Sequence, residues 1–81
     1  MKKKLSFEQE LEGRVLMAFD GSPVGRGLAE RIRLAARTAC VNHGLHDARI
    51  VIRQVGNGYH LEVVPPPRRP RVQRIVLSLG R

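Results

Sequence analysis

The spacing of apolar residues changes once along this chain of 81 residues, and the change separates a helical part from a strand part. Between residues 5 and 18 the apolar positions form one helical stripe, at Phe7, Leu11, Val15 and Ala18. Ser6 precedes the stripe and Gln9 follows three residues later, which is the spacing of a capping box. We therefore expect a helix here. A strand is the alternative, because residues 5–12 also alternate and Gly13 disfavours a helix by about 1 kcal/mol relative to alanine.

A second helix is predicted from about Pro23 to about His43, after turn residues at 20–23. At 100° per residue, one side of it is apolar and the other is charged. The apolar side carries Val24, Leu28, Ile32, Ala35 and Ala39, and the charged side carries Arg26, Glu30, Arg33 and Arg37. Gly44 stands where a left-handed residue ends a helix, and Leu45 is expected to pack back near Cys40.

From Arg49 onwards the period is two, which predicts a hairpin of residues 49–55 and 59–64. Asn57-Gly58 is suited to a type I′ turn. That turn would pair Ile52 with Val63, Gln54 with Leu61, and Arg53 with Glu62. One face of the hairpin is then apolar, with Ile50, Ile52, Leu61 and Val63. The other face carries Arg49, Arg53, His60 and Glu62, together with Val51, Val55 and Val64.

Residues 72–79 alternate again and predict a third strand, after prolines at 65–67 that end the second one. The expected fold class is therefore α+β: two helices followed by a three-stranded antiparallel sheet (ααβββ), in a two-layer sandwich. The chain is expected to be a single small basic domain, residues 1–81, with a Pro/Arg-rich connector at 65–71. Val51, Val55 and Val64 lie on the second sheet face, where the first helix, an oligomer mate or a larger assembly would cover them, and we predict a protein interface there.

The formal net charge is +8, and five of these charges fall in residues 65–81. So concentrated a field favours a polyanion or an acidic protein surface as partner. The predicted contact residues are Arg68, Arg69, Arg71 and Arg74, joined by Arg26, Arg33 and Arg37 of the second helix. The alternatives are a proline-motif ligand, a plain solubilising linker and a solvated helix face.

Catalytic chemistry is not indicated, because the sequence shows no paired carboxylates and no activated serine or cysteine. A zinc site from Cys40, His43, His46 and His60 is conceivable by spacing but weakly supported. Residues 21–27 lack the lysine of a phosphate-binding loop. We expect no enzyme activity, no cofactor and no metal. A lone cysteine excludes an internal disulfide and fits a reducing, intracellular setting.

We therefore expect a non-enzymatic structural or interaction module. Its partners would be other protein subunits in a homo- or hetero-oligomer, with nucleic acid as a further candidate and no membrane. A bacteriophage virion or a nucleoprotein complex would be such an assembly, in the cytoplasm or in a virion assembled there. The alternatives are a free DNA- or RNA-binding regulatory protein and a small protein inhibitor of a single partner.

Overall fold

The structure is a computed structural model, and it describes residues 5–20, 26–66 and 73–80. Two helices come first, α1 (Phe7–Asp20) and α2 (Arg26–Asn42). Three strands follow, β1 (Arg49–Val55), β2 (Gly58–Val64) and β3 (Ile75–Leu79). The strands form one antiparallel sheet in the order β1-β2-β3. The predicted ααβββ fold is confirmed.

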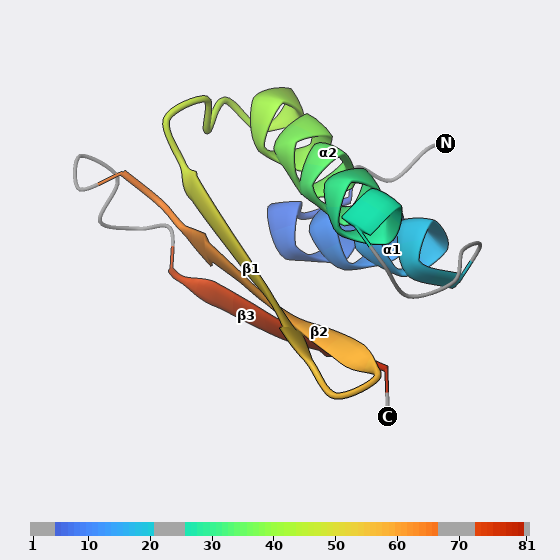
Figure 1. Ribbon diagram of the computed structural model, residues 1–81. Helices are drawn as coiled ribbons and strands as arrows, with labels where there is room; N and C mark the ends of the chain where they lie inside the picture. Colours follow the sequence, from blue (N-terminus) through green and yellow to red (C-terminus); the bar gives the residue numbers. More distant parts are fainter. Residues whose placement is uncertain (1–4, 21–25, 67–72, 81) are drawn as a thin grey trace.

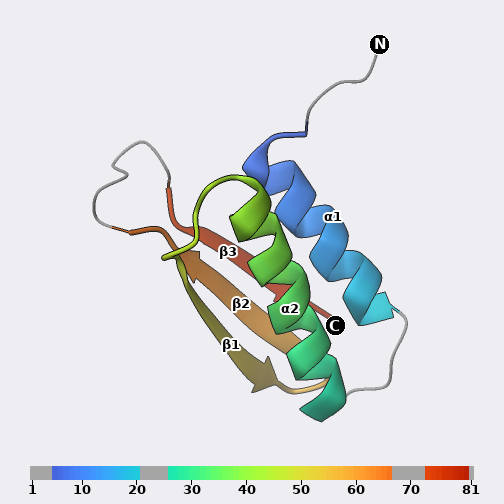
Figure 2. The ribbon, with the colours of Figure 1, turned by 90° about the horizontal axis from the view of Figure 1, so that it is seen from above.

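Both helices lie side by side on the same face of the sheet, with α2 packed over β1 and α1 over β3 (Figures 1 and 2). The described elements therefore form two layers, and none of them covers the other face of the sheet. The core fills the space between the layers, and its fully buried large side chains come from all of α1, α2 and β2: Leu11, Val15, Ile32, Cys40, Leu61 and Val63.

Two of the helix ends predicted from the sequence, the start of α1 and the end of α2, are confirmed. Ser6 Oγ accepts a hydrogen bond from the Gln9 amide at 3.2 Å, and the Ser6 amide donates to Gln9 Oε1 at 3.1 Å, so the capping box closes. Residues 5–12 are therefore not a strand. At the end of α2, Gly44 has φ 74° and the Leu45 amide donates to the Cys40 carbonyl at 2.8 Å. Leu45 is 2% exposed, so it packs back as expected.

The buried side of α2 is rotated slightly from the predicted one. Ala36 and Cys40 are fully buried with Leu28, Ile32 and Ala39, whereas Ala35 is only half-buried. The predicted start at Pro23 and the core position Val24 lie outside the described residues.

The predicted hairpin register is wrong by two residues. The observed pairs are Ile52 with Leu61, Arg53 with His60 and Val55 with Gly58, so the turn residues are Gly56 and Asn57. Gly56 has φ 59°, and no described residue other than glycine has a positive φ, which is the pattern of a type II′ turn. Because a shift of two preserves the face of every side chain, the predicted inner and outer faces are correct.

Gly58 is needed at its position for a reason other than the turn. A Cβ there would overlap the main-chain carbonyl oxygen of Leu79. The end of β3 therefore passes so close to the hairpin that only glycine fits. In β3 itself, Ile75, Leu77 and Leu79 face the core and Val76 and Ser78 face outward, as the alternation predicted.

Candidate interaction surface

No other described element covers the outer face of the sheet, since both helices pack on the inner face. The pairing of the strands arranges its side chains in rows that cross the sheet. These rows are Arg49 with Val64; Val51 with Glu62 and Val76; and Arg53 with His60 and Ser78.

Apolar side chains stand exposed on this outer face. Val51 is 36% exposed, Val76 47% and Val55 61%, while Val64 is half-buried. The solvent-facing side of an antiparallel sheet usually carries polar residues. The described residues give these valines no partner layer, so a contact with another molecule is their most direct explanation.

The charged groups of the outer face leave an excess of positive charge. Arg74 Nη1 lies 3.0 Å from Glu62 Oε2, with the two side chains 63% and 24% exposed. The sequence had suggested that Glu62 pairs with Arg53. Glu62 pairs instead with Arg74, because the observed register places Val51, and not Arg53, opposite Glu62. No described residue forms an ion pair or hydrogen bond with the exposed Arg49 or Arg53, which stand about 13 Å apart along β1.

Two of the three arginines predicted on the charged side of α2 bind main-chain carbonyls. Arg37 Nη1 donates to the carbonyls of His46 and Ala48, both at 3.1 Å, and Arg33 Nη1 donates to the Ile50 carbonyl in a long contact of 3.5 Å. Glu30 lies 3.7 Å from Arg33, so it pairs within α2. These arginines therefore hold α2 against the start of β1, although Arg33 remains exposed and keeps its charge near the surface.

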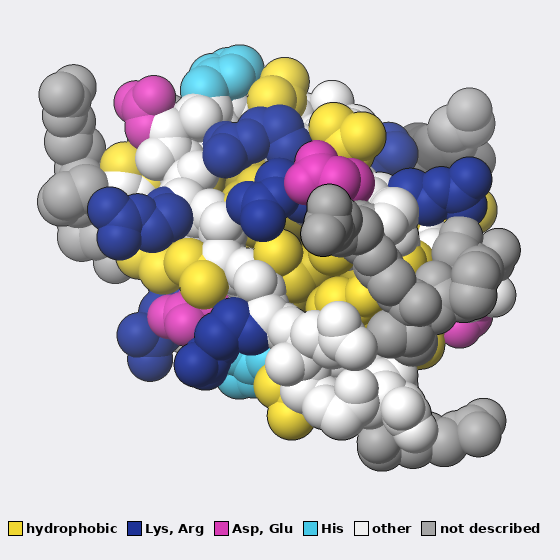
Figure 3. Space-filling model, in the orientation of Figure 1, with side chains coloured by type: hydrophobic (Ala, Val, Ile, Leu, Met, Phe, Trp, Pro, Cys, Tyr) yellow, Lys and Arg dark blue, Asp and Glu magenta, His cyan; other side chains and the backbone are white. Residues whose placement is uncertain are grey.

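Figure 3 shows Arg side chains where α2 and the sheet meet, and others elsewhere on the same face. Of the contact residues predicted from the sequence, Arg33 and Arg37 lie along α2, and Arg74 lies on the outer sheet face. The side chain of Arg26 and all of Arg68, Arg69 and Arg71 lie outside the described residues.

The tightest polar cluster in the described part of the chain joins the start of α1 to the end of α2. Glu10 accepts hydrogen bonds from Arg14 Nε and Asn42 Nδ2, both at 2.8 Å, and its Oε1 lies 3.0 Å from His43 Nε2. Hydrogen bonds from Asn42, Arg14 and His43 lower the pKa of Glu10 from 4.5 to about 2. An ionised carboxylate only accepts, so His43 carries a proton on Nε2.

This cluster has a structural role, because its partners tie α1 to the end of α2: Arg14 lies in α1, Asn42 is the last residue of α2, and His43 directly follows it. The His43 ring also packs on Phe7, with centroids 5.5 Å apart. The sequence did not single out Glu10. Two of its three partners are 32 and 33 residues away, so no local pattern could have revealed them.

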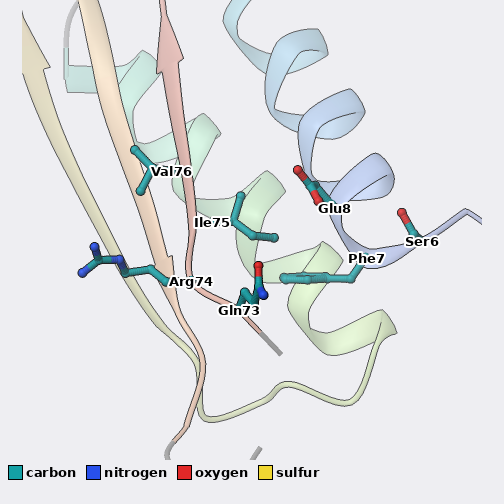
Figure 4. A pocket seen from close by; sticks show the side chains of 7 residues that line it. All are labelled: Ser6, Phe7, Glu8, Gln73, Arg74, Ile75 and Val76. Atoms are coloured by element: carbon teal, nitrogen blue, oxygen red, sulfur yellow. The ribbon is translucent and has the colours of Figure 1, made fainter. Parts of the chain in front are cut away.

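A pocket of about 440 Å³ opens between the first turn of α1 and the start of β3. It is lined by Ser6, Phe7, Glu8, Gln73, Arg74, Ile75 and Val76 (Figure 4). Phe7 and Ile75 point into the space between the helix and the strand, and Glu8 lies on the helix side of it. The sequence had given no sign of this pocket, which exists only because α1 packs beside the free edge of β3.

The residues considered for zinc are not brought together. Cys40 is buried in the core, His43 is bound to Glu10, His46 is exposed after α2, and His60 lies on the outer sheet face. No cluster of three metal-ligating side chains occurs within the described ranges. Burial raises the pKa of the Cys40 thiol, and the positive charge of Arg37 opposes that shift only in part.

Comparisons with protein-family models, curated proteins and solved structures gave no match. Among the described helices, none combines the length and the apolar character needed to cross a membrane.

Proposed function

We propose that the protein is a non-enzymatic interaction module, a small subunit of a larger assembly, and that the outer face of its sheet binds an acidic protein surface. The observation that carries this proposal is the exposure of Val51, Val55 and Val76 on a face that neither helix covers. Arginine mixed with apolar side chains is typical of protein interfaces, where lysine and acidic residues are depleted.

The charges of the outer face favour an acidic partner. Arg49 and Arg53 have no counter-charge among the described residues, and the one acid of the face, Glu62, is already paired with Arg74. Val51, Val55 and Val76 favour a protein partner over nucleic acid, because apolar side chains gain nothing against a phosphate backbone. The described part of this face also has no Phe, Tyr or Trp side chain on which bases could stack, and its imidazole, His60, is half-buried.

A second candidate function, binding of nucleic acid, is favoured by the net charge of +8. The two candidates differ in what they require. An acidic protein partner needs both the valines and the arginines, whereas a nucleic acid needs the arginines alone.

Two double variants separate these functions. V51T/V55T keeps β-branched side chains but makes two of the exposed valine positions polar, and R49Q/R53Q removes the unpaired charges. Leu34→Thr, on an exposed position of α2, is the matched control. Complexes formed in the native host would be captured after nuclease treatment, cross-linked and mapped by mass spectrometry.

We expect cross-links from the outer sheet face to one protein partner, lost in both double variants, retained in the control and weakened by salt. Capture that survives V51T/V55T, or that nuclease abolishes, would refute the proposal. Salt-sensitive binding of a short DNA duplex that falls only in R49Q/R53Q would establish the second candidate instead.

A further inference from the structure

The two edges of the sheet differ in whether side chains of the overlying helix bind their main-chain groups. At the β1 edge, the Arg33 and Arg37 side chains of α2 reach over and occupy the carbonyls of Ile50 and Ala48. At the β3 edge, no side chain of the described residues binds the outer main-chain groups of Val76 or Ser78. Edge strands that remain unprotected can pair with another chain, and β1 is protected at its start where β3 is not.

The register shows which main-chain groups β3 leaves unpaired. Arg33 binds the Ile50 carbonyl from outside the sheet, so Ile50 and Val63 do not hydrogen-bond to each other. Along a strand in an antiparallel sheet, the main-chain groups of successive residues point alternately to one neighbouring strand and to the other. The main-chain groups of Val63 therefore hydrogen-bond to Ile75 of β3. The amides and carbonyls of Val76 and Ser78 must then point to the free edge.

The side of α1 that overhangs this edge is acidic. Glu8 lines the pocket beside Val76, and Glu12 follows one helical turn later on the same side of α1. Both are exposed, and no described residue forms an ion pair with either of them. Phe7 and Ile75 add an apolar surface between helix and strand (Figure 4). Arg74, at the mouth of the pocket, is neutralised by Glu62.

From this geometry we propose that the β3 edge accepts a fourth strand, supplied by an extended segment of a partner protein that alternates apolar and basic residues. The main chain of the segment would pair with Val76 and Ser78. Its basic side chains would face α1, with their aliphatic stems on Phe7 and Ile75 and their charges at the carboxylates of Glu8 and Glu12, while its apolar side chains would lie on the opposite face of the added strand. This surface is separate from the outer sheet face, so the inference does not rest on the function proposed above.

A second copy of the chain fits this edge poorly. Because α1 lies over β3, symmetric pairing of two β3 strands would bring the two α1 axes to about one strand spacing, ~5 Å. Packed helices need about 8–10 Å between their axes. The occupant is therefore a segment without a helix on that face.

The test uses the peptide acetyl-Lys-Val-Lys-Val-Lys-Val-Lys-amide, with a version in which glutamate replaces every lysine, and reads amide hydrogen exchange by NMR. In the free protein the amides of Val76 and Ser78 should exchange fast, while that of Leu77, paired with β2, is protected. The basic peptide should slow exchange at Val76 and Ser78, and the acidic peptide should not. The E8K/E12K variant should bind the basic peptide about tenfold more weakly, since two exposed ion pairs are lost.

Proline variants test strand addition directly. Ser78→Pro removes an outward amide without touching the β2–β3 ladder and should abolish peptide binding. Gln54→Pro does the same on the β1 edge and should leave binding unchanged. If Ser78→Pro fails to fold, E8K/E12K still decides.

Three outcomes would overturn the inference. These are an absence of protection at Val76 and Ser78, equal protection by the acidic peptide, and protection that rises with protein concentration before any peptide is added. The last would mean that a second copy occupies the edge. Because the readout comes from β3 amides, it is independent of the outer-face variants.

Discussion

Replacement of Gly58 by alanine tests the close passage of the end of β3 across the hairpin. A Cβ at this position would overlap the Leu79 carbonyl oxygen and lie 2.9 Å from the Leu79 carbonyl carbon and 3.1 Å from Gly80 Cα. All of these are main-chain atoms, so no side-chain rotation can relieve the contact. Either the end of β3 moves away from β2 or the hairpin changes its register.

Overpacking of this kind costs about 1–3 kcal/mol. For a domain of this size, each kcal/mol corresponds to roughly 4–8 °C in Tm, so we expect Gly58→Ala to lower the Tm by roughly 5–20 °C. Gly13→Ala is the matched control, because its Cβ would meet nothing within 4 Å in the middle of α1. It should raise the stability by about 0.8–1 kcal/mol.

Thermal unfolding followed by circular dichroism measures both changes, and amide exchange at Leu79 reports whether β3 stays paired with Tyr59. The same substitution, glycine to alanine, is expected to lower the stability at position 58 and to raise it at position 13. A Gly58→Ala protein with the Tm of the wild type and a protected Leu79 amide would refute the packing described for the end of β3.

Three further predictions concern the helices. The ionised Glu10 stabilises the fold above its usual pKa of 4.5, and this contribution is lost as the pH falls towards its folded pKa of about 2; Glu10→Gln should therefore unfold at lower urea than the wild type at pH 7, with the gap closing near pH 2. Cys40 is fully buried with a raised pKa, so a thiol reagent at neutral pH should react with it only as fast as the protein unfolds; rapid labelling of the folded state would contradict its burial. Arg37→Ala leaves the carbonyls of His46 and Ala48 without their donor and should cost about 1 kcal/mol in urea unfolding; an unchanged midpoint would show that this contact carries no stability.

Features that depend on neighbouring residues were predictable from the sequence. The capping box of Ser6 and Gln9, the helix end at Gly44 and the alternation of β3 all involve contacts within a few positions, so their residue types reveal them. The same holds for the inner and outer faces of the hairpin, because period two survives an error of two residues in register.

The register itself was not predictable, because the run Gly56-Asn57-Gly58 supports two different two-residue turns. The structure uses Gly56 for the positive φ and leaves Gly58 free for the approach of Leu79, a residue 21 positions later in the chain. The pairing of Glu62 with Arg74 follows from that register and from β3 lying beside β2.

The chain's local patterns determined which elements form and which side of each is apolar, because periodicity and caps act over one or two turns. Tertiary structure alone decided where those sides lie. Because both helices lie on one face of the sheet, no described element covers Val51 and Val76 on the other face. Because α2 lies over β1, its arginines bind carbonyls at the β1 edge, whereas no described side chain binds the outer main-chain groups of Val76 and Ser78 in β3. The physical reason is that layer packing depends on contacts between residues far apart in the chain, which no local pattern records.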